Sequence, residues 1–509
     1  MNKVKRLLMT ILTSGVATIL SFLISFILTP YITNQLGVEA YGFVTLAKNF
    51  TQYATIITTA LNSYSSRYIT VSYYQNDKKK AQEYISSVYY GNVTVSTVIM
   101  IVATAFIIFL DRILNISTEL VFPVKILFFF VFLSFVLTTV GTSYTAAAYI
   151  KNRLDIVGVF RSLSYVFEVV FYLIIFNCVT PEVWQVGVAL CIAQLVIFGG
   201  NYYIYKNYTP ELKIKRKYVS IDAIKKLVIN GVWNSINSLG NTLNSGLDLI
   251  VTNLWLSDLA MGQIAITKTI PSIFMSFNQL LAQPFQPLLL KSYSDGDKNK
   301  LISELKLSMK LTGLFSSIIF AGFVSLGKVF YNLWIPGQDI DLIYILTVIT
   351  MLSSVIEGPV YPLYYIYTLT VKNKIPCIIT VLGGVLNVAG MAVLIKYSPL
   401  GIYSIVLTTT IIMLFINLVT NPLYMTHCLN IKWFTFYPSL IKTVISCMTM
   451  TFVFIIIKNM LNPNTWVQFI LTALLCGIVG SIIHLLLVFS NKEKSQILHI
   501  MLRRKNRKK

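Results

Sequence analysis

Two lysines lie inside apolar stretches of this sequence, where a charged side chain is costly. Lys48 follows the segment Ala40-Tyr41-Gly42, and Lys268 follows Ala260-Met261-Gly262, at the same spacing and 220 positions later. A lysine deep in a membrane-spanning helix costs about 2.5–3.5 kcal/mol on insertion scales. Because this cost recurs at matching positions, we expect both ammonium groups to face a polar cavity, where two cations suit an anionic substrate such as a phosphate. Snorkelling of each side chain to the interface is the alternative.

Uncharged polar residues recur at helical spacing beside these lysines. One series follows Lys48, at Gln52, Thr55, Thr59, Asn62 and Ser66. A second series comprises Asn230, Asn234, Asn237, Asn241, Asn244 and Asp248. Intervals of three and four place each series on one helix face. Amides in hydrocarbon need partners, so each face predicts either polar contacts between helices or a water-filled passage. The length of the two series favours the passage.

Four further ionisable residues lie in apolar segments. Arg161 and Glu168 are seven positions apart, on one face of the same segment, and Glu357-Gly358-Pro359 predicts a broken helix because proline lacks a backbone donor. Glu168, Glu357 and Asp248 are candidates for binding a coupling proton or cation. Glu168 and Glu357 are equally suited to pairing with a lysine, and the sequence leaves both roles open.

The sequence offers little for enzyme chemistry. The segment 322–329 resembles a phosphate-binding loop, but it has Val329 where Ser or Thr must contact magnesium. The three histidines are isolated, and the six cysteines are scattered without metal-ligand spacing. We therefore expect no enzymatic activity, no metal site and no cofactor.

Composition predicts the elements that position these residues. The chain has 509 residues, of which 56% are hydrophobic and 12% charged, whereas soluble domains carry about 25% charged residues. Apolar runs long enough to span hydrocarbon recur throughout, and helices satisfy the backbone there. We expect an all-α membrane protein with about fourteen transmembrane helices, near 7–29, 41–66, 84–110, 121–149, 155–177, 183–205, 225–247, 259–290, 305–332, 341–368, 376–396, 400–426, 434–457 and 465–489.

The basic residues indicate the orientation of these helices. With the N-terminus inside, 34 of the 41 Lys and Arg residues fall in cytoplasmic segments, including the C-terminal tail. The net charge of +22 is then a consequence of topology, and it does not indicate nucleic acid binding. Both termini are expected in the cytoplasm.

The repeat at an offset of 220 predicts the domain organisation. Six spans separate the equivalent helices at 7 and 225, so both copies keep one orientation and would be related by a pseudo-two-fold axis along the membrane normal. We expect, in chain order, a six-helix lobe at 1–205, a basic cytoplasmic loop at 206–224, a six-helix lobe at 225–430, two added helices at 431–491 and a basic tail at 492–509.

The segment from Leu28-Thr29-Pro30 to Leu36–Gly42, the span count and the loop Lys151-Asn152-Arg153 resemble one known group of proteins. It is the polysaccharide-transporter branch, that of the Wzx-like oligosaccharide flippases, of the multidrug/oligosaccharidyl-lipid/polysaccharide exporter (MOP) superfamily. The resemblance implies two lobes that alternate between inward and outward access in a bacterial plasma membrane. It also implies outward transfer of an undecaprenyl-pyrophosphate-linked oligosaccharide for capsule, exopolysaccharide, O-antigen or teichoic acid.

On this resemblance, glycosyltransferases and a polymerase of the same pathway are the expected partners. We assign Lys48, Lys268 and Arg161 to the pyrophosphate, and Gln52, Asn234, Asn237 and Asn241 to the remaining substrate contacts. Three alternatives stay open: a cation-coupled multidrug exporter, a lipid II flippase of the same superfamily, and a lipid-binding scaffold without transport. A drug exporter for organic cations would need an acidic cavity, whereas this sequence predicts a basic one.

Overall fold

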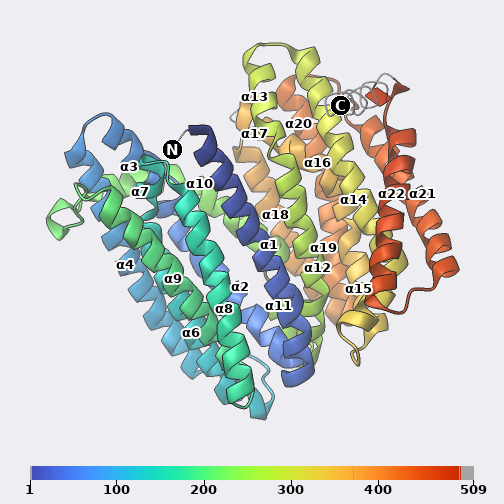
Figure 1. The fold of residues 1–509 in the computed structure, drawn as a ribbon, viewed down its shortest axis with the longest axis horizontal. Helices are drawn as coiled ribbons and strands as arrows, with labels where there is room; N and C mark the ends of the chain where they lie inside the picture. The colour runs from blue at the N-terminus through green and yellow to red at the C-terminus, as the bar shows by residue number, and fades with distance from the viewer. Residues whose placement is uncertain (1–2, 371, 492, 495–509) are drawn as a thin grey trace. The chain divides into compact units, whose positions relative to one another are not determined.

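The computed structural model describes residues 3–370, 372–491 and 493–494, and throughout these residues the ordered elements are helices (Figure 1). Apart from residues 493 and 494, the predicted tail at 492–509 lies outside the described residues. The chain divides into two compact units, of which the first comprises 1–266 with 380–388, and the second comprises 267–379 with 389–509. The lobes expected from the repeat have other boundaries, and they stay a prediction.

The first unit contains the helices from α1 to α11, the start of α12 and a short part of α18. Their bounds are α1 Lys3–Leu36, α2 Val38–Asn62, α3 Ser65–Tyr74, α4 Lys78–Ile108, α5 Leu110–Ile113, α6 Val121–Thr142, α7 Thr145–Ile150, α8 Leu154–Cys178, α9 Trp184–Tyr208, α10 Ile221–Ser245 and α11 Asp248–Trp255. Single 3-10 turns lie at Thr118–Leu120 and Arg216–Tyr218. Helix α1 packs on α8, α8 on α9, α9 on α6 and α6 on α4, while α2 contacts α1, α4 and α6 and packs along α10.

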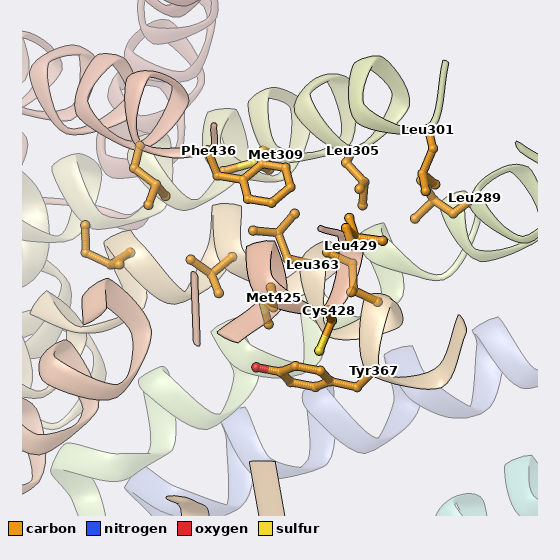
Figure 2. Packing of buried hydrophobic residues seen from close by; sticks show 14 residues of the cluster. Leu289, Leu301, Leu305, Met309, Leu363, Tyr367, Met425, Cys428, Leu429 and Phe436 are labelled. Carbon is orange, nitrogen blue, oxygen red and sulfur yellow. The ribbon is translucent and has the colours of Figure 1, made fainter. Parts of the chain in front are cut away.

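The second unit contains the rest of α12 and the remaining helices. Their bounds are α12 Asp258–Ala282, α13 Phe285–Ser294, α14 Lys298–Trp334, α15 Ile340–Leu352, α16 Ser354–Val360, α17 Tyr365–Thr370, α18 Lys374–Tyr397, α19 Tyr403–Phe415, α20 Asn421–Leu429, α21 Tyr437–Leu461 and α22 Trp466–Val488. A 3-10 turn, Tyr361–Tyr364, precedes α17, and a π-helical turn, Ile416–Thr420, joins α19 to α20. Helix α14 packs against α15, α16, α21 and α22. A buried apolar cluster joins α13, α14, α17, α20 and α21 around Met309, Leu363 and Met425 (Figure 2).

The duplication expected from the sequence is present in the helix bounds. Three consecutive helices of the first half, α2 and α3 in full and α4 at its start, have counterparts in α12, α13 and α14 displaced by 220 residues. The caps repeat as well, because Asp77 accepts a hydrogen bond from the amide of Lys80, and Asp297 accepts one from the amide of Lys300, each at 3.0 Å. An N-terminal aspartate of this kind satisfies an otherwise unpaired helix amide.

The fourteen predicted spans are all present as helices or as runs of consecutive helices. Eleven of them are long and apolar enough to cross a membrane by composition alone. The other three, α2, α10 and α12, have 25 residues each. At 1.5 Å per residue each is about 37 Å long, enough for a hydrocarbon core of about 30 Å. These three polar helices carry both lysines and both polar series, except for Ser66, which lies on α3, and Asp248, which begins α11.

The linker between α9 and α10 is tied to helices of the first unit outside the apolar spans. Glu211 accepts a hydrogen bond from the Tyr73 hydroxyl at 2.5 Å and lies 3.7 Å from the Lys151 ammonium. Burial raises the pKa of Glu211, but the hydrogen bond from Tyr73 and the charge of Lys151 outweigh it, so that the pKa lies below its ordinary value of 4.5. The pKa of Lys151 is raised, chiefly by its hydrogen bond to Tyr73. Glu211 is therefore ionised at neutral pH and anchors the linker.

Candidate functional site

Helices α2 and α10 lie side by side and antiparallel in the first unit. The carbonyl of Ala60 fills the place of a Cβ on Gly231, so only glycine allows this approach. Ser235 donates a hydrogen bond to the carbonyl of Ile56 at 2.8 Å. At the far end of the pair, the side chains of Asn49 and Tyr53 donate to the carbonyl of Gly246. Along these contacts the residue numbers of α2 decrease as those of α10 increase, so the two helices are antiparallel.

The two polar series lie on the same side of this helix pair. On α2 the contact residues Tyr53, Ile56 and Ala60 each follow a member of the first polar series by one position, and Asn49 follows Lys48 in the same way. On α10 the contact residues Gly231 and Ser235 follow Asn230 and Asn234 in the same way. One position is a rotation of about 100° about the helix axis. Because the helices are antiparallel, equal rotations in the same sense about the two axes bring both series to one side of the pair.

This combined surface, which we name the polar face, is exposed on the first unit. Its exposed members include Gln52, Thr55, Asn234, Asn237 and Asn241. The sequence predicted that each series lies on one helix face. It did not predict that α2 and α10 would be neighbours, since the two series are about 180 positions apart in the chain.

Lys48 lies at one end of the polar face and interacts with an acid on another helix. Its side chain is half-buried on α2 and interacts electrostatically with the carboxylate of Glu168 on α8. Glu168 is 5% exposed and accepts a hydrogen bond from Tyr172 at 3.3 Å. The ring of Tyr172 stacks on Phe176, which stacks on Tyr31 of α1. The aromatic stack thus packs beside Glu168, whose electrostatic interaction with Lys48, here called the Lys48–Glu168 pair, acts between α8 and α2 without an ion-pair contact within 4.0 Å among the described residues.

Two members of the second series lie off the exposed part of the polar face. Asn244 is buried and donates to the carbonyls of Gly240 and Thr380, the latter at 2.6 Å. The backbone carbonyl of Asn244 in turn accepts a hydrogen bond from the side chain of Asn387. Asn244 therefore connects α10 to α18. Asp248 is also buried, at the start of α11, where it interacts electrostatically with Tyr53.

Arg161 differs from its helical neighbour Glu168 in its surroundings. Both lie on α8, but the Arg161 side chain is exposed whereas Glu168 is buried. Among the described residues, no carboxylate lies within ion-pairing distance of Arg161. Its guanidinium is therefore accessible to a ligand that approaches α8.

The second unit holds the remaining two candidates. Lys268 is half-buried on α12. Glu357 is half-buried on the short helix α16 and interacts electrostatically with Tyr361 and Tyr364. The break predicted at Glu357-Gly358-Pro359 is present, because α16 ends at Val360 and is followed by a 3-10 turn. Glu357 thus lies where the backbone departs from a regular helix.

Amides and hydroxyls surround this break. Tyr364 donates to Asn417 at 2.8 Å and accepts from Asn421 at 3.0 Å, and Tyr367 donates to Asn421 at 2.9 Å. Asn417 lies in the π-helical turn, a feature frequent at functional sites. The sequence analysis did not identify these residues, although Asn417 and Asn421 at a spacing of four were a visible signal.

The unit also has an apolar pocket of about 240 Å³, lined by residues of α12, α14, α21 and α22 that include Phe323, Phe454 and Phe469. It offers little to a charged headgroup. Among the described residues, no group of three or more His, Cys, Asp or Glu side chains is arranged to hold a metal ion. The polar face with Lys48 is accordingly the surface best suited to a polar anion.

Comparison with known proteins agrees with this architecture. A family model described as "Polysaccharide biosynthesis protein" matches residues 7–289. The uncharacterized membrane protein EpsK of Bacillus subtilis (strain 168) is 28% identical over 482 residues, which is 95% of each chain.

Two solved structures share the fold. The lipid II flippase MurJ, in an inward closed conformation, has a TM-score of 0.69 at 14% identity, over 94% of this chain and 98% of MurJ. An inward-facing multidrug resistance transporter of the MATE family has a TM-score of 0.64 at 15% identity, over 81% and 96% of the two chains. At these identities the likeness shows the fold alone. The family match, which covers more than half of the chain, shows that this multi-pass membrane protein belongs to the polysaccharide biosynthesis protein family.

Proposed function

We propose that this protein is a flippase for an anionic lipid-linked saccharide. Its substrate would be an undecaprenyl-pyrophosphate-linked oligosaccharide, moved by alternating access from the inner to the outer leaflet of a bacterial plasma membrane. The observation that carries the proposal is the exposed polar face of α2 and α10, with the ammonium of Lys48 at one end.

An exposed polar face on a membrane-spanning helix pair has few physical explanations. In lipid, each polar group without a partner costs several kcal/mol, so side chains such as Asn234 and Asn237 must face water or another polar surface. Amides and hydroxyls that line a wet path offer donors and acceptors to sugar hydroxyls. A saccharide can thus exchange its bonds with water for bonds with the polar face as it moves.

Lys48 and Glu168 supply the step that depends on charge. A pyrophosphate carries more negative charge than one carboxylate, and it competes with Glu168 for the Lys48 ammonium. Glu168 neutralises the lysine when no substrate is bound, which avoids an unpaired charge inside the membrane. When the substrate binds, the Lys48 ammonium exchanges Glu168 for the phosphate as its partner. When the Lys48–Glu168 interaction forms again, it favours release of the substrate. On this mechanism Glu168 is the internal competitor of the substrate.

The remaining candidates extend this mechanism. We assign Lys268 to the pyrophosphate as the repeat equivalent of Lys48, and Arg161 to the same anion on account of its exposed guanidinium. Glu357 is our candidate for a coupling proton or sodium ion, because it lies among the hydroxyls of Tyr361 and Tyr364 at a helix break. The basic segments support cytoplasmic termini, and glycosyltransferases and a polymerase would act on either side of this step.

The likeness to MurJ supports a second candidate substrate, lipid II, which is also a polyprenyl-pyrophosphate-linked saccharide. The chemistry of the polar face fits both. The saccharide that accumulates in the inner leaflet after deletion of the gene distinguishes them: a repeat unit of a surface polysaccharide supports the first candidate, and lipid II supports the second.

The lysine assignment is tested by the double variant Lys48→Ala/Lys268→Ala. We expect loss of surface polysaccharide in cells whose membranes hold as much of the variant as of the wild-type protein. Lys396→Ala, at the exposed end of α18, is the matched control and should export normally. Normal polysaccharide in the double variant would contradict the role of both lysines.

A further inference from the structure

The polar face has a second cation at the end opposite Lys48. Lys226 precedes Asn230 by four positions, so it continues the second series by one helical turn. Asn230 fixes this turn, because its amide donates to the carbonyl of Lys226 at 2.7 Å and to the hydroxyl of Tyr68 at 3.1 Å. The Lys226 ammonium lies over the Tyr68 ring, 5.4 Å from its centroid.

The Lys226 ammonium, at this end of the polar face, differs from other cations of the first unit in its surroundings. Nearby, Lys151 and Arg153 pair with Glu211 and Asp155. Within the described residues, by contrast, no carboxylate lies within ion-pairing distance of Lys226, which is exposed.

The Tyr68 hydroxyl is in a similar position. It accepts the hydrogen bond from Asn230, and no described side chain or carbonyl accepts its proton. Its ring also packs against Tyr84, at 5.3 Å between ring centroids. A cation and a hydroxyl donor thus stand together on a fixed aromatic support.

The polar face extends over the full thickness of the hydrocarbon core, with Lys226 and Tyr68 at one end. Lys48 lies beside the contact of Asn49 with Gly246, which is 20 residues from Lys226 along α10. At 1.5 Å per residue the separation is about 30 Å, the thickness of the hydrocarbon core. One cation therefore lies at each end of an exposed polar surface as long as the membrane is thick.

We infer that Lys226 and Tyr68 form a docking site for a phosphate or pyrophosphate anion, separate from Lys48, where the headgroup of a lipid-linked saccharide waits at one end of the polar face. This inference rests on the proposed function. The ammonium supplies the charge, the Tyr68 hydroxyl donates to a phosphate oxygen, and the amides from Asn230 onward receive the sugars.

The test measures binding of inorganic pyrophosphate to the full-length protein in phosphatidylcholine nanodiscs. Lys226→Ala and Tyr68→Phe should each weaken binding to this site, the first by about tenfold, as for a lost charge-assisted hydrogen bond. Lys225→Ala is the matched control, because Lys225 is also exposed but lies 100° away from Lys226 on α10. It should change the affinity by less than about twofold. In a Lys48→Ala background the effect of Lys226→Ala should persist, since the two sites are separate.

Three outcomes would overturn the inference: equal losses in Lys226→Ala and Lys225→Ala, no loss in Lys226→Ala, or loss of the Lys226 effect when Lys48 is absent. Nanodiscs that contain phosphatidylglycerol distinguish the source of the anion. If bulk anionic lipid abolishes the Lys226-dependent binding, an ordinary headgroup fills the site and the inference fails. Export by Lys48→Ala cells is scored separately, so normal export there would refute the proposed function while pyrophosphate binding at Lys226 still stood.

Discussion

The Lys48–Glu168 pair makes a prediction that separates a competitor from a simple structural ion pair. Removing one partner of a buried pair costs about 3–5 kcal/mol, because the other charge stays buried without compensation. Lys48 is half-buried and Glu168 is 5% exposed. We therefore expect Lys48→Ala to destabilise the fold by about 2–3 kcal/mol, below that range, because the Lys48 side chain is only half-buried.

The second variant, Glu168→Gln, keeps the shape of the side chain and removes its charge. If Glu168 competes with the substrate, pyrophosphate should bind this variant about five- to tenfold more tightly, because Lys48 no longer has to leave a carboxylate. Polysaccharide export should nevertheless fall, since release loses its driving force. A purely structural Glu168 would give lower stability without a gain in affinity.

The assay combines a double-mutant cycle with binding. Thermal unfolding in nanodiscs should rank the wild type first, Lys48→Ala/Glu168→Gln second and Lys48→Ala last, with a coupling energy of about 1–3 kcal/mol. Pyrophosphate affinity should fall about 10- to 100-fold in Lys48→Ala. Additive stability effects would refute the pair, and unchanged or weaker binding by Glu168→Gln would refute the competition.

Three other predictions concern packing, the linker and coupling. Gly42→Ala should destabilise by about 1–3 kcal/mol in thermal unfolding, because a Cβ there would lie 2.9 Å from the backbone of Gly262, whereas Gly199→Ala meets nothing within 4 Å and should be neutral or stabilising. Glu211→Gln should speed trypsin cleavage of the linker between α9 and α10 at neutral pH. Because the pKa of Glu211 is lowered, the wild-type linker should become more easily cleaved only as the pH falls through that pKa. Equal cleavage rates of the variant and the wild type at neutral pH would show that Glu211 does not anchor the linker. Glu357→Gln should abolish any dependence of export on the proton or sodium gradient while leaving pyrophosphate binding within about twofold; unchanged ion dependence would remove Glu357 from the coupling role.

The helices themselves were predictable because the signals that define them are local. Apolar length located the spans, and the aspartates at 77 and 297 mark helix starts by a contact three residues away. The sequence repeat at an offset of 220 is also found in the helix bounds, because the two copies contain the same local signals.

The partners in the site were less predictable because they depend on packing. Glu168 lies 120 positions from Lys48, and only the placement of α8 brings the two charges together. Asn244 followed the polar spacing of its helix, yet it is buried because a segment of α18 covers that turn. Periodicity specifies which residues share a face, and it does not specify what that face meets.

The polarity of α2 and α10 is physically tolerable because the contact between the two helices is close and hydrogen-bonded. Gly231 and Ala60 bring the backbones close, and Ser235 and Tyr53 direct their polar groups at carbonyls. Small residues and satisfied hydrogen bonds are the means by which helices associate in lipid, where the hydrophobic effect does not drive them together. The contact therefore contributes stability that the polar face cannot supply. A helix pair built in this way keeps one surface free to exchange water for a polar substrate.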